Sequence, residues 1–188
     1  WHVGATNNGD TETPDWGADT PHRTGVVVRA LTKDDILEAL RARRTFATED
    51  SNLALALRAG EAWMGSIVPK APAITFSVDV VDPDGESVTL ELFDRGLVVV
   101  RASFSGATTY TWEPTAPGVA GHFYFVKATQ ADGDTAYTSP IWVEGVAPAD
   151  AVLLNEFLPA PRSVDWDNDG TADYNDEWIE LYNAGQAV

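Results

Sequence analysis

The sequence predicts a mainly β protein that begins with a partial α/β segment. Apolar and polar residues alternate through several stretches, the clearest of which covers residues 74–80. Turn-forming sequences separate these stretches at intervals of about ten residues, as in a β-sandwich. Only residues 32–44 have the apolar spacing of a helix. We predict three parts: residues 1–69, 70–146 and 150–188.

Residues 1–69 have the pattern of the closing part of an α/β unit. A loop leads to Val26-Val27-Val28, an apolar run of the kind that forms a strand buried on both faces. Thr32 is suited to cap a helix, because its hydroxyl can accept a hydrogen bond from the first turn. Two short strands are predicted at residues 45–48 and 53–57. Three arginines are predicted in the last turn of the helix, where positive charge is favoured: Arg41, Arg43 and Arg44.

Residues 70–146 have the pattern of a β-sandwich. Their strands are separated by turn sequences, which are Asp82-Pro83-Asp84-Gly85, Asp94-Arg95-Gly96 and Asp132-Gly133. The chain contains no cysteine, so the sandwich is immunoglobulin-like in architecture at most. The alternation predicts that six large side chains face inward: Phe76, Leu90, Trp112, Phe123, Phe125 and Trp142.

Residues 150–188 contain two predicted strands, at residues 152–157 and 177–182, with an acidic loop between them. Two strands bury too little apolar surface for a stable domain. We therefore expect this part to be the start of a larger, truncated sandwich. We also expect the whole chain to be a fragment that is cut inside domains at both ends.

The acidic loop, residues 165–176, is the most specific motif. Carboxylates stand at loop positions 1, 3, 5, 9 and 12 and a glycine at position 6, which is the ligand spacing of a calcium loop. The predicted ligands are the side chains of Asp165, Asp167, Asp169 and Asp173, the carbonyl of Thr171, and the carboxylate of Asp176 or Glu177. Position 12 differs from the EF-hand pattern, which has Glu there, and no long helices flank the loop. The alternative is a solvated acidic turn.

Charge excludes some partners. The chain has 29 acidic and 12 basic residues, a net charge of −17. This balance argues against nucleic acid or an anionic membrane surface as a partner, and it suits cation binding in an extracellular medium. No apolar run approaches the ~20 residues of a transmembrane helix, so we expect no transmembrane segment.

Two histidine positions are candidates for binding. His22 and Arg23 stand together at the start of a predicted strand, where they would bind an anionic substrate or serve only as surface residues. His2 is a candidate metal ligand, or a polar residue near the chain end. One histidine does not make a site, because zinc needs three or four ligands.

The C-terminal part resembles a known family. Val152-Leu153-Leu154-Asn155-Glu156-Phe157 and, after the acidic loop, Asp176-Glu177-Trp178-Ile179-Glu180-Leu181-Tyr182-Asn183 look like the opening of a lamin-tail domain. That family is an immunoglobulin-like sandwich found in bacterial secreted and surface proteins as well as in lamins. The resemblance implies a secreted or cell-surface location, and it does not itself establish calcium binding.

The N-terminal part resembles the C-terminal end of a polymerase-and-histidinol-phosphatase (PHP) metallohydrolase. The matching stretches are Trp1-His2, residues 22–26 and 36–50, and the later strand Ser139-Pro140-Ile141-Trp142-Val143. The resemblance implies a phosphoesterase-like barrel with clustered zinc, iron or manganese. Only His2 matches a metal ligand of that family, because the other ligand motifs lie outside this chain.

Two functions therefore remain open. In the first, the chain is an inactive fragment of a secreted multidomain PHP-type hydrolase with accessory β domains. In the second, it is a calcium-binding module that attaches its parent protein to a surface, polymer or protein partner. With one candidate catalytic-metal ligand, the chain itself is expected to be catalytically silent.

Overall fold

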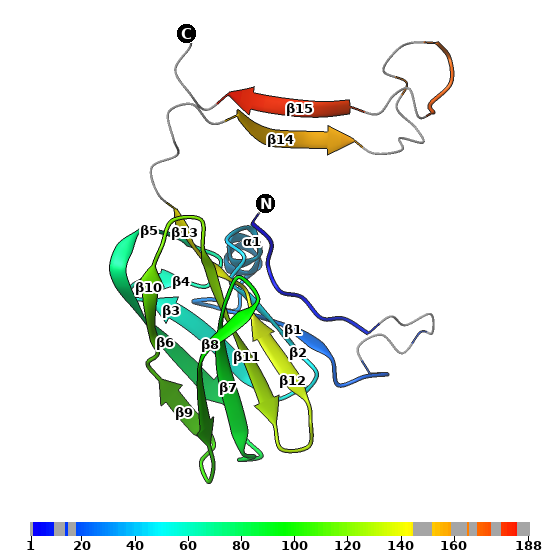
Figure 1. Ribbon diagram of the computed structural model, residues 1–188. Coiled ribbons are helices and arrows are strands. Elements are labelled where there is room, and N and C mark those ends of the chain that lie inside the picture. The colour runs from blue at the N-terminus through cyan, green and yellow to red at the C-terminus, as the bar shows by residue number, and fades with distance from the viewer. Residues whose placement is uncertain are drawn as a thin grey trace. The chain divides into compact units, whose positions relative to one another are not determined.

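The computed structural model describes residues 2–9, 14, 18–144, 152–158, 165, 169–173 and 178–183. The chain divides into two units, Trp1–Gly145 and Val146–Val188. The first unit is a β-sandwich of two sheets, and the second contains a two-stranded sheet (Figure 1). The prediction of a mainly β fold is confirmed.

The larger sheet of the sandwich has eight strands and is centred on β11 (Phe123–Gln130). One edge of β11 pairs with β7, which in turn pairs with β8. The other edge is shared by β12, which continues through β2 to β1, and by β13, which pairs in parallel with β5. The other strands of this sheet are β1 (Arg23–Val26), β2 (Thr45–Thr48), β5 (Ile67–Pro69), β7 (Val88–Asp94), β8 (Leu97–Phe104), β12 (Thr135–Thr138) and β13 (Ile141–Glu144).

The smaller sheet has five strands around β6 (Ala71–Val81). One edge of β6 pairs with β3, which continues to β4, and the other edge is shared by β9 and β10. The other strands of this sheet are β3 (Ala54–Ala59), β4 (Ala62–Trp63), β9 (Thr109–Trp112) and β10 (Thr115–Gly118).

The core lies between the two sheets. On β6, the side chains of Phe76, Val78 and Val80 are fully buried, and on β7 those of Leu90 and Leu92 are fully buried. Alternate residues of a strand point to opposite faces, so each strand contributes one apolar row to this core. The alternation predicted for residues 74–80 is confirmed.

The single helix of the described residues, α1 (Lys33–Arg41), begins as predicted. The hydroxyl of Thr32 accepts a hydrogen bond from the amide of Asp35, at 3.2 Å. The helix ends earlier than predicted, because Arg43 takes a left-handed conformation with φ of 57°. Only Arg41 lies in the last turn, so the prediction for the other two arginines is wrong. Arg43 instead donates to the carbonyl of Gly65, and Arg44 donates to the carbonyl of Val27.

The boundary predicted after residue 69 does not separate two units in the structure. All of β3 pairs with β6, β2 pairs with β12, and β5 pairs with β13. Leu55 and Leu57 of β3 are almost fully buried in the shared core. The sequence predicts strands at residues 45–48 and 53–57, but alternation within a strand does not show which strand will pair with it.

The inward face of β11 also differs from the prediction. Tyr124 and Val126 are fully buried, whereas Phe123 and Phe125 are half-buried on the opposite face. The ring of Phe125 stacks on that of Phe93, with centroids 4.8 Å apart. Both alternating rows of β11 are apolar, so periodicity does not decide between them. Of the other four predicted core residues, Phe76 and Leu90 are buried in the core as predicted, and Trp112 is half-buried. Trp142 is buried on the opposite face of β13 from the core residues Ile141 and Val143, against His2 and Arg43, so its predicted inward face is wrong.

The second unit contains β14 (Val152–Leu158) and β15 (Trp178–Asn183). They pair antiparallel, with a register shift between Leu154 and Glu156. The acidic loop connects them. Across all the described residues, no helix has the length and apolar character needed to cross a membrane.

Candidate metal sites

The described part of the acidic loop is folded around Asp165. The amide of Gly170 donates to Oδ2 of Asp165 at 3.0 Å, and the amide of Thr171 donates to Oδ1 of Asp169 at 2.8 Å. Gly170 has φ of 95°, a left-handed conformation that favours glycine. This glycine therefore permits the sharp turn that position 6 of a calcium loop requires.

The two carboxylate oxygens of Asp165 differ in their hydrogen bonding: Oδ2 accepts a bond, as described above, and Oδ1 does not. Its Oδ1 is buried and has no hydrogen-bond partner among the described residues. A buried carboxylate oxygen without a partner is costly, and a hard cation is one way to satisfy it. Asp165 and Asp173 are half-buried, while Asp169 and Thr171 are exposed. Three further predicted ligands lie outside the described residues: Asp167, Asp176 and Glu177.

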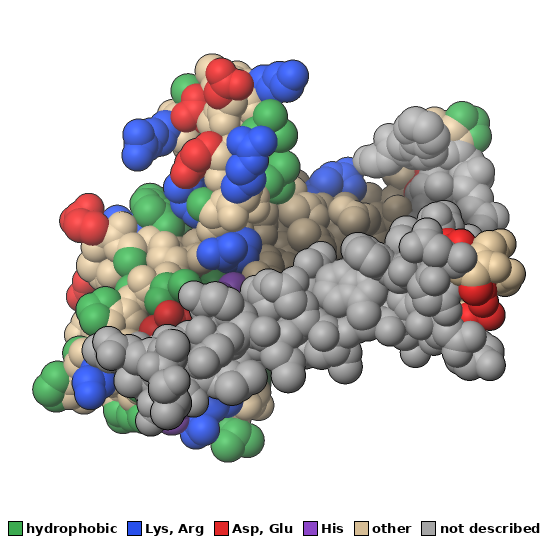
Figure 2. Space-filling view, turned by 90° about the horizontal axis from the view of Figure 1, so that it is seen from above, with side chains coloured by type: hydrophobic (Ala, Val, Ile, Leu, Met, Phe, Trp, Pro, Cys, Tyr) green, Lys and Arg blue, Asp and Glu red, His purple; other side chains and the backbone are tan. Residues whose placement is uncertain are grey.

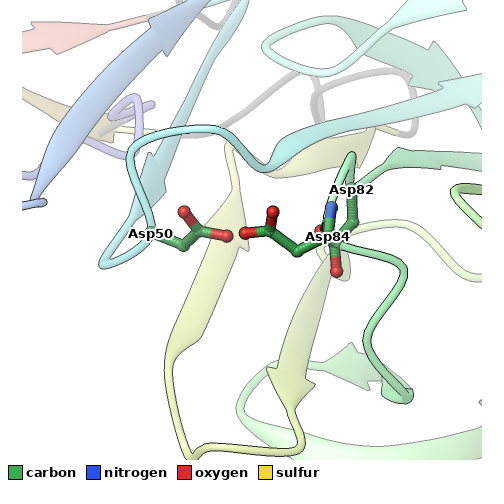
Figure 3. A group of neighbouring side chains, drawn as sticks. All are labelled: Asp50, Asp82 and Asp84. Atoms are coloured by element: carbon green, nitrogen blue, oxygen red, sulfur yellow. Dashed lines mark hydrogen bonds between the residues drawn. The ribbon is translucent and has the colours of Figure 1, made fainter.

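A second group of carboxylates lies at one end of the sandwich. Asp50 lies between β2 and β3, and Asp82 and Asp84 lie between β6 and β7. Each contributes one oxygen, and these oxygens all lie within 4.8 Å of one another. Figure 3 shows the Asp50 carboxylate facing the loop that carries the other two. We call this group the aspartate cluster.

Local turn chemistry brings the aspartate cluster together. The amide of Asp84 donates to Oδ1 of Asp82 at 3.0 Å, and the amide of Asn52 donates to Oδ1 of Asp50 at 2.9 Å. Such bonds from an amide two residues on are the usual reason why Asp is favoured in turns. The side-chain amide of Asn52 then links the two loops by donating to Oδ2 of Asp84 at 2.8 Å.

The aspartate cluster extends into the core through Gln130 of β11. The Nε2 of this buried glutamine donates to Oδ2 of Asp50 at 3.0 Å and to Oδ2 of Asp82 at 3.3 Å. Asp82 is fully buried. Within the part of the chain that the structure describes, no Lys, Arg or His forms an ion pair with any of the three aspartates. Among the described residues, the negative charge concentrated here has no cationic partner in an ion pair.

Neighbouring carboxylates add to this charge. Burial of one end of Glu86 raises the pKa of its carboxyl, and the charges of Asp132 and of the aspartate cluster raise it further. Its Oε2 is buried and has no hydrogen-bond partner in the described structure. The pKa of Asp134 is raised too, by burial and then by Asp132. The pKa of Glu49 is lowered, because the side chain and the amide of Thr135 donate to its carboxylate.

Sequence reasoning missed the aspartate cluster. It interpreted Asp82-Pro83-Asp84-Gly85 only as a turn, and Asp50 is 32 residues away from Asp82 in the chain. The available signal was the spacing of Asp82, Asp84 and Glu86, which puts three carboxylates at alternate positions after a long strand. The approach of Asp50 depends on the pairing of β3 with β6, which a single sequence does not reveal.

The structure gives His2 protein contacts. Its Nε2 lies 3.3 Å from Oε1 of Glu144, and its ring packs edge-on against Trp142 with centroids 4.5 Å apart. Burial lowers the pKa of His2, and Glu144 partly opposes that shift. No group of three or more ligating side chains among the described residues includes His2, since the aspartate cluster is the one such group there.

The His22–Arg23 pair lies at the start of β1, where Arg23 makes local hydrogen bonds. Arg23 donates to the carbonyls of Thr20 and His22, both at 2.7 Å. Both residues are half-buried at the start of β1. The third histidine, His122, lies with its Nδ1 2.8 Å from Oδ2 of Asp94. The structure thus brings neither His22 nor His122 into the aspartate cluster.

Comparisons with known proteins find distant relatives. No protein-family model matches the chain. It is 25% identical over 142 residues to an uncharacterized protein of Chlamydia muridarum, and 25% identical over 151 residues to one of Chlamydia pneumoniae. Each match covers 66% of this chain and 23% of the relative, so the chain spans about a quarter of the length of these relatives.

One solved structure is also similar in part. It is the crystal structure of an engineered protein, with 21% sequence identity and a TM-score of 0.31. The match covers 48% of this chain and 20% of that protein. A similarity at this level supports no argument about the fold or the function.

Proposed function

We propose that this chain is a calcium-binding β module of a longer, secreted or cell-surface protein. The observation that carries the proposal is the hydrogen bonding of the Asp165 carboxylate. Its Oδ2 is held by the Gly170 amide while its Oδ1 is buried without a partner. It stands at position 1 of a loop with the ligand spacing of a calcium site.

The aspartate cluster is proposed as a second calcium site. Calcium takes 6–8 oxygen ligands at 2.3–2.6 Å, so oxygens that share one ion lie at most about 5 Å apart. The oxygens of Asp50, Asp82 and Asp84 meet that limit. Carboxylate ligands without nitrogen or sulfur favour calcium over zinc, and turns of this kind suit the variable geometry of calcium better than the strict octahedral geometry of magnesium.

Calcium at the aspartate cluster would stabilise the sandwich directly. The loop between β2 and β3 and the loop between β6 and β7 both cross from one sheet to the other. An ion shared by Asp50 and Asp82 would tie these two crossings together and offset the repulsion between their carboxylates. The module would then be most stable in calcium-rich extracellular fluid. There it would bind its partner, which would be a surface, a polymer or a protein, through a rigid face.

A PHP-type hydrolase in the parent protein is the second candidate function. It is supported by the residues that resemble that family, Trp1-His2 and the stretches 22–26 and 36–50. The relatives, which are much longer than the matched part, support only a longer parent protein. In this proposal His2 would bind a zinc, manganese or iron ion together with residues of the parent protein. Replacing His2 by alanine in the full-length protein should then abolish metal-dependent hydrolysis, and unchanged metal content would refute the assignment.

The calcium proposal is tested by a nuclear magnetic resonance titration of this chain with calcium. The amides of Gly170 and Thr171 should shift with a Kd of about 10⁻⁴–10⁻³ M, as for extracellular modules. The amides of Asn52, Asp84 and Gly85 should report the second site independently.

Each site provides the control for the other. The double variant Asp165→Asn/Asp169→Asn should lose the loop response and keep that of the aspartate cluster. The variant Asp50→Asn/Asp84→Asn should do the reverse. Asparagine preserves the turn hydrogen bonds while removing charge. If neither set of amides responds at several millimolar calcium, the proposal is wrong.

A further inference from the structure

Four exposed side chains form a stripe along helix α1. Leu37 is four positions from both Lys33 and Arg41. It is three positions from Leu40, so the four side chains are neighbours on one side of the helix. Leu37 is 37% exposed and Leu40 44%, and both cations are exposed as well. We call these four residues the α1 stripe.

The leucines of the α1 stripe are left in solvent. Isolated helices shorter than about 12–15 residues are marginal in water, and most helix stability in proteins comes from a buried apolar face. Single exposed leucines are ordinary on protein surfaces. Here two are adjacent, and Leu31, just before the helix, is 90% exposed. An exposed apolar patch with polar residues at its edge is typical of an interaction site.

The cations of the α1 stripe are unpaired, in contrast to most arginines of the sandwich. Neither Lys33 nor Arg41 forms an ion pair among the described residues. Asp34 borders the stripe, so two cations stand beside one anion there. Elsewhere in the sandwich, four arginines pair with carboxylates: Arg44 with Glu38, Arg58 with Asp79, Arg95 with Asp94 and Arg101 with Glu91. The stripe is therefore a basic, apolar surface in a chain of net charge −17.

The surface formed by the residues just before the helix has the same character. A groove there is lined by Val27, Val28, Arg29, Arg44 and Trp63. Arg29 is exposed and likewise forms no ion pair among the described residues. Figure 2 shows hydrophobic, basic and acidic side chains together on the ridge that projects from the sandwich. Basic and apolar groups thus continue beyond the α1 stripe.

We propose that the α1 stripe binds an acidic amphipathic helix of a protein partner. Lys33 and Arg41 begin and end the helix, so they stand about 12 Å apart along its axis. A partner helix that lies along α1 would pair with both cations through carboxylates two turns apart. Apolar side chains between those carboxylates would cover Leu37 and Leu40, as in other helix-binding surfaces. The inference goes beyond the calcium sites and does not depend on them.

Other occupants fit the charges of the α1 stripe less well. In an antiparallel pair of two copies, Lys33 of one copy would face Arg41 of the other, so like charges would meet. An anionic membrane would also approach the many acidic residues around the stripe, and the net charge of −17 opposes that. A single acidic helix touches the stripe alone. Charges beyond the Debye length, about 8 Å at physiological ionic strength, are screened from it.

The inference is tested by a nuclear magnetic resonance titration of this chain, in calcium-free buffer, with a helical probe peptide. The probe carries the pattern Glu-x-x-x-Leu-x-x-Leu-Glu among alanines and glutamines, which repeats the spacing of the α1 stripe with glutamate in place of both cations. The amides of residues 33–41 should shift when it binds. A matched peptide with lysine in place of both glutamates should bind about tenfold or more weakly. Salt at about 0.5 M should reduce that difference.

Two variants separate the charged and apolar parts of the α1 stripe. Lys33→Gln/Arg41→Gln should remove the preference for the glutamate peptide over the lysine peptide. Leu37→Gln/Leu40→Gln should weaken binding of the glutamate peptide about tenfold, because it removes the apolar contact. Glutamine keeps the helix propensity in both variants. The control variant Lys70→Gln/Arg95→Gln, which removes as much positive charge from exposed positions elsewhere, should bind like the unaltered chain.

Several results would overturn the inference. Equal binding of the two peptides by the unaltered chain, or no shift at residues 33–41 with either, would do so whether or not the variants fold. Binding to phosphatidylserine vesicles without a preference between the peptides would assign the α1 stripe to a membrane. Shifts at residues 33–41 that grow with the concentration of the chain alone would assign it to a second copy. Unchanged β6 and β11 amides verify that the sandwich is intact in each variant. Calcium is absent throughout, so failure here leaves the calcium proposal standing.

Discussion

At the scale of single residues, the account depends on carboxylates that the fold holds in unfavourable surroundings. Oδ1 of Asp165 and Oε2 of Glu86 are buried without a hydrogen-bond partner among the described residues, and Asp82 is fully buried beside other acids. Native proteins rarely leave buried oxygens like those of Asp165 and Glu86 unsatisfied unless a function or an ion requires them. These side chains are therefore the first to test.

Replacing Glu86 by glutamine should raise the melting temperature at pH 7 in the absence of calcium. The pKa of Glu86 is raised in the folded state, so keeping it ionised at neutral pH costs stability. That stability returns as the pH falls through the raised pKa. The gain from Glu86→Gln should therefore disappear below about pH 3.5, well under the ordinary pKa of 4.5, where the carboxyl is protonated in both states. It should also shrink in excess calcium.

The control for this prediction is Glu113→Gln, which removes one charge from an exposed position. Its effect on the melting temperature should lie within the small range typical of surface changes. If the Glu86→Gln variant is no more stable than this control at pH 7, the ionised carboxylate of Glu86 does not destabilise the folded state.

At the scale of elements, β11 shows what the sequence determines and what it leaves open. The run Phe123-Tyr124-Phe125-Val126 predicts a strand, and the structure contains one. Because both alternating rows are apolar, the inward row is chosen by the partners on either side. Tyr124 pairs with Asp94 and Ile141, and Val126 pairs with the buried Leu92.

Two substitutions that each add one hydroxyl group distinguish the faces of β11. Val126→Thr has nearly the same shape but places a hydroxyl in the core, so it should lower the free energy of unfolding by about 1–3 kcal/mol. Phe125→Tyr should change it by less than about 0.5 kcal/mol, because that ring lies on the half-exposed outer face. Urea denaturation measures both. The opposite order of effects would mean that Phe125 faces the core.

At the scale of the whole molecule, the sandwich is built from residues on both sides of the predicted boundary at residue 69. A polypeptide of residues 72–145 would lack β3, which covers one edge of β6, and the buried side chains of Leu55, Leu57 and Met64. It should show no cooperative thermal unfolding, whereas the 188-residue chain should. A sharp transition of residues 72–145 alone would contradict the shared core.

The structure also shows which features could be predicted from the sequence alone. Local chemistry correctly predicted the mainly β class, the Thr32 cap and the inward row of β6, because each depends on neighbours in the chain. The pairing of β3 with β6 joins residues 17 to 27 positions apart, and the approach of Asp50 to Asp82 joins residues 32 positions apart. No periodicity encodes such pairings, so the sequence predicted the acidic loop but not the aspartate cluster.

The most direct test of the central claim counts bound calcium. Equilibrium dialysis of the chain against radioactive calcium at about 5 mM, well above the expected Kd, should find about two ions per molecule. The Asp165→Asn/Asp169→Asn and Asp50→Asn/Asp84→Asn variants should each bind about one. The control variant Glu61→Gln/Glu113→Gln, which removes as much charge from exposed positions, should still bind about two. No specific binding, or equal binding by all four proteins, would contradict the account.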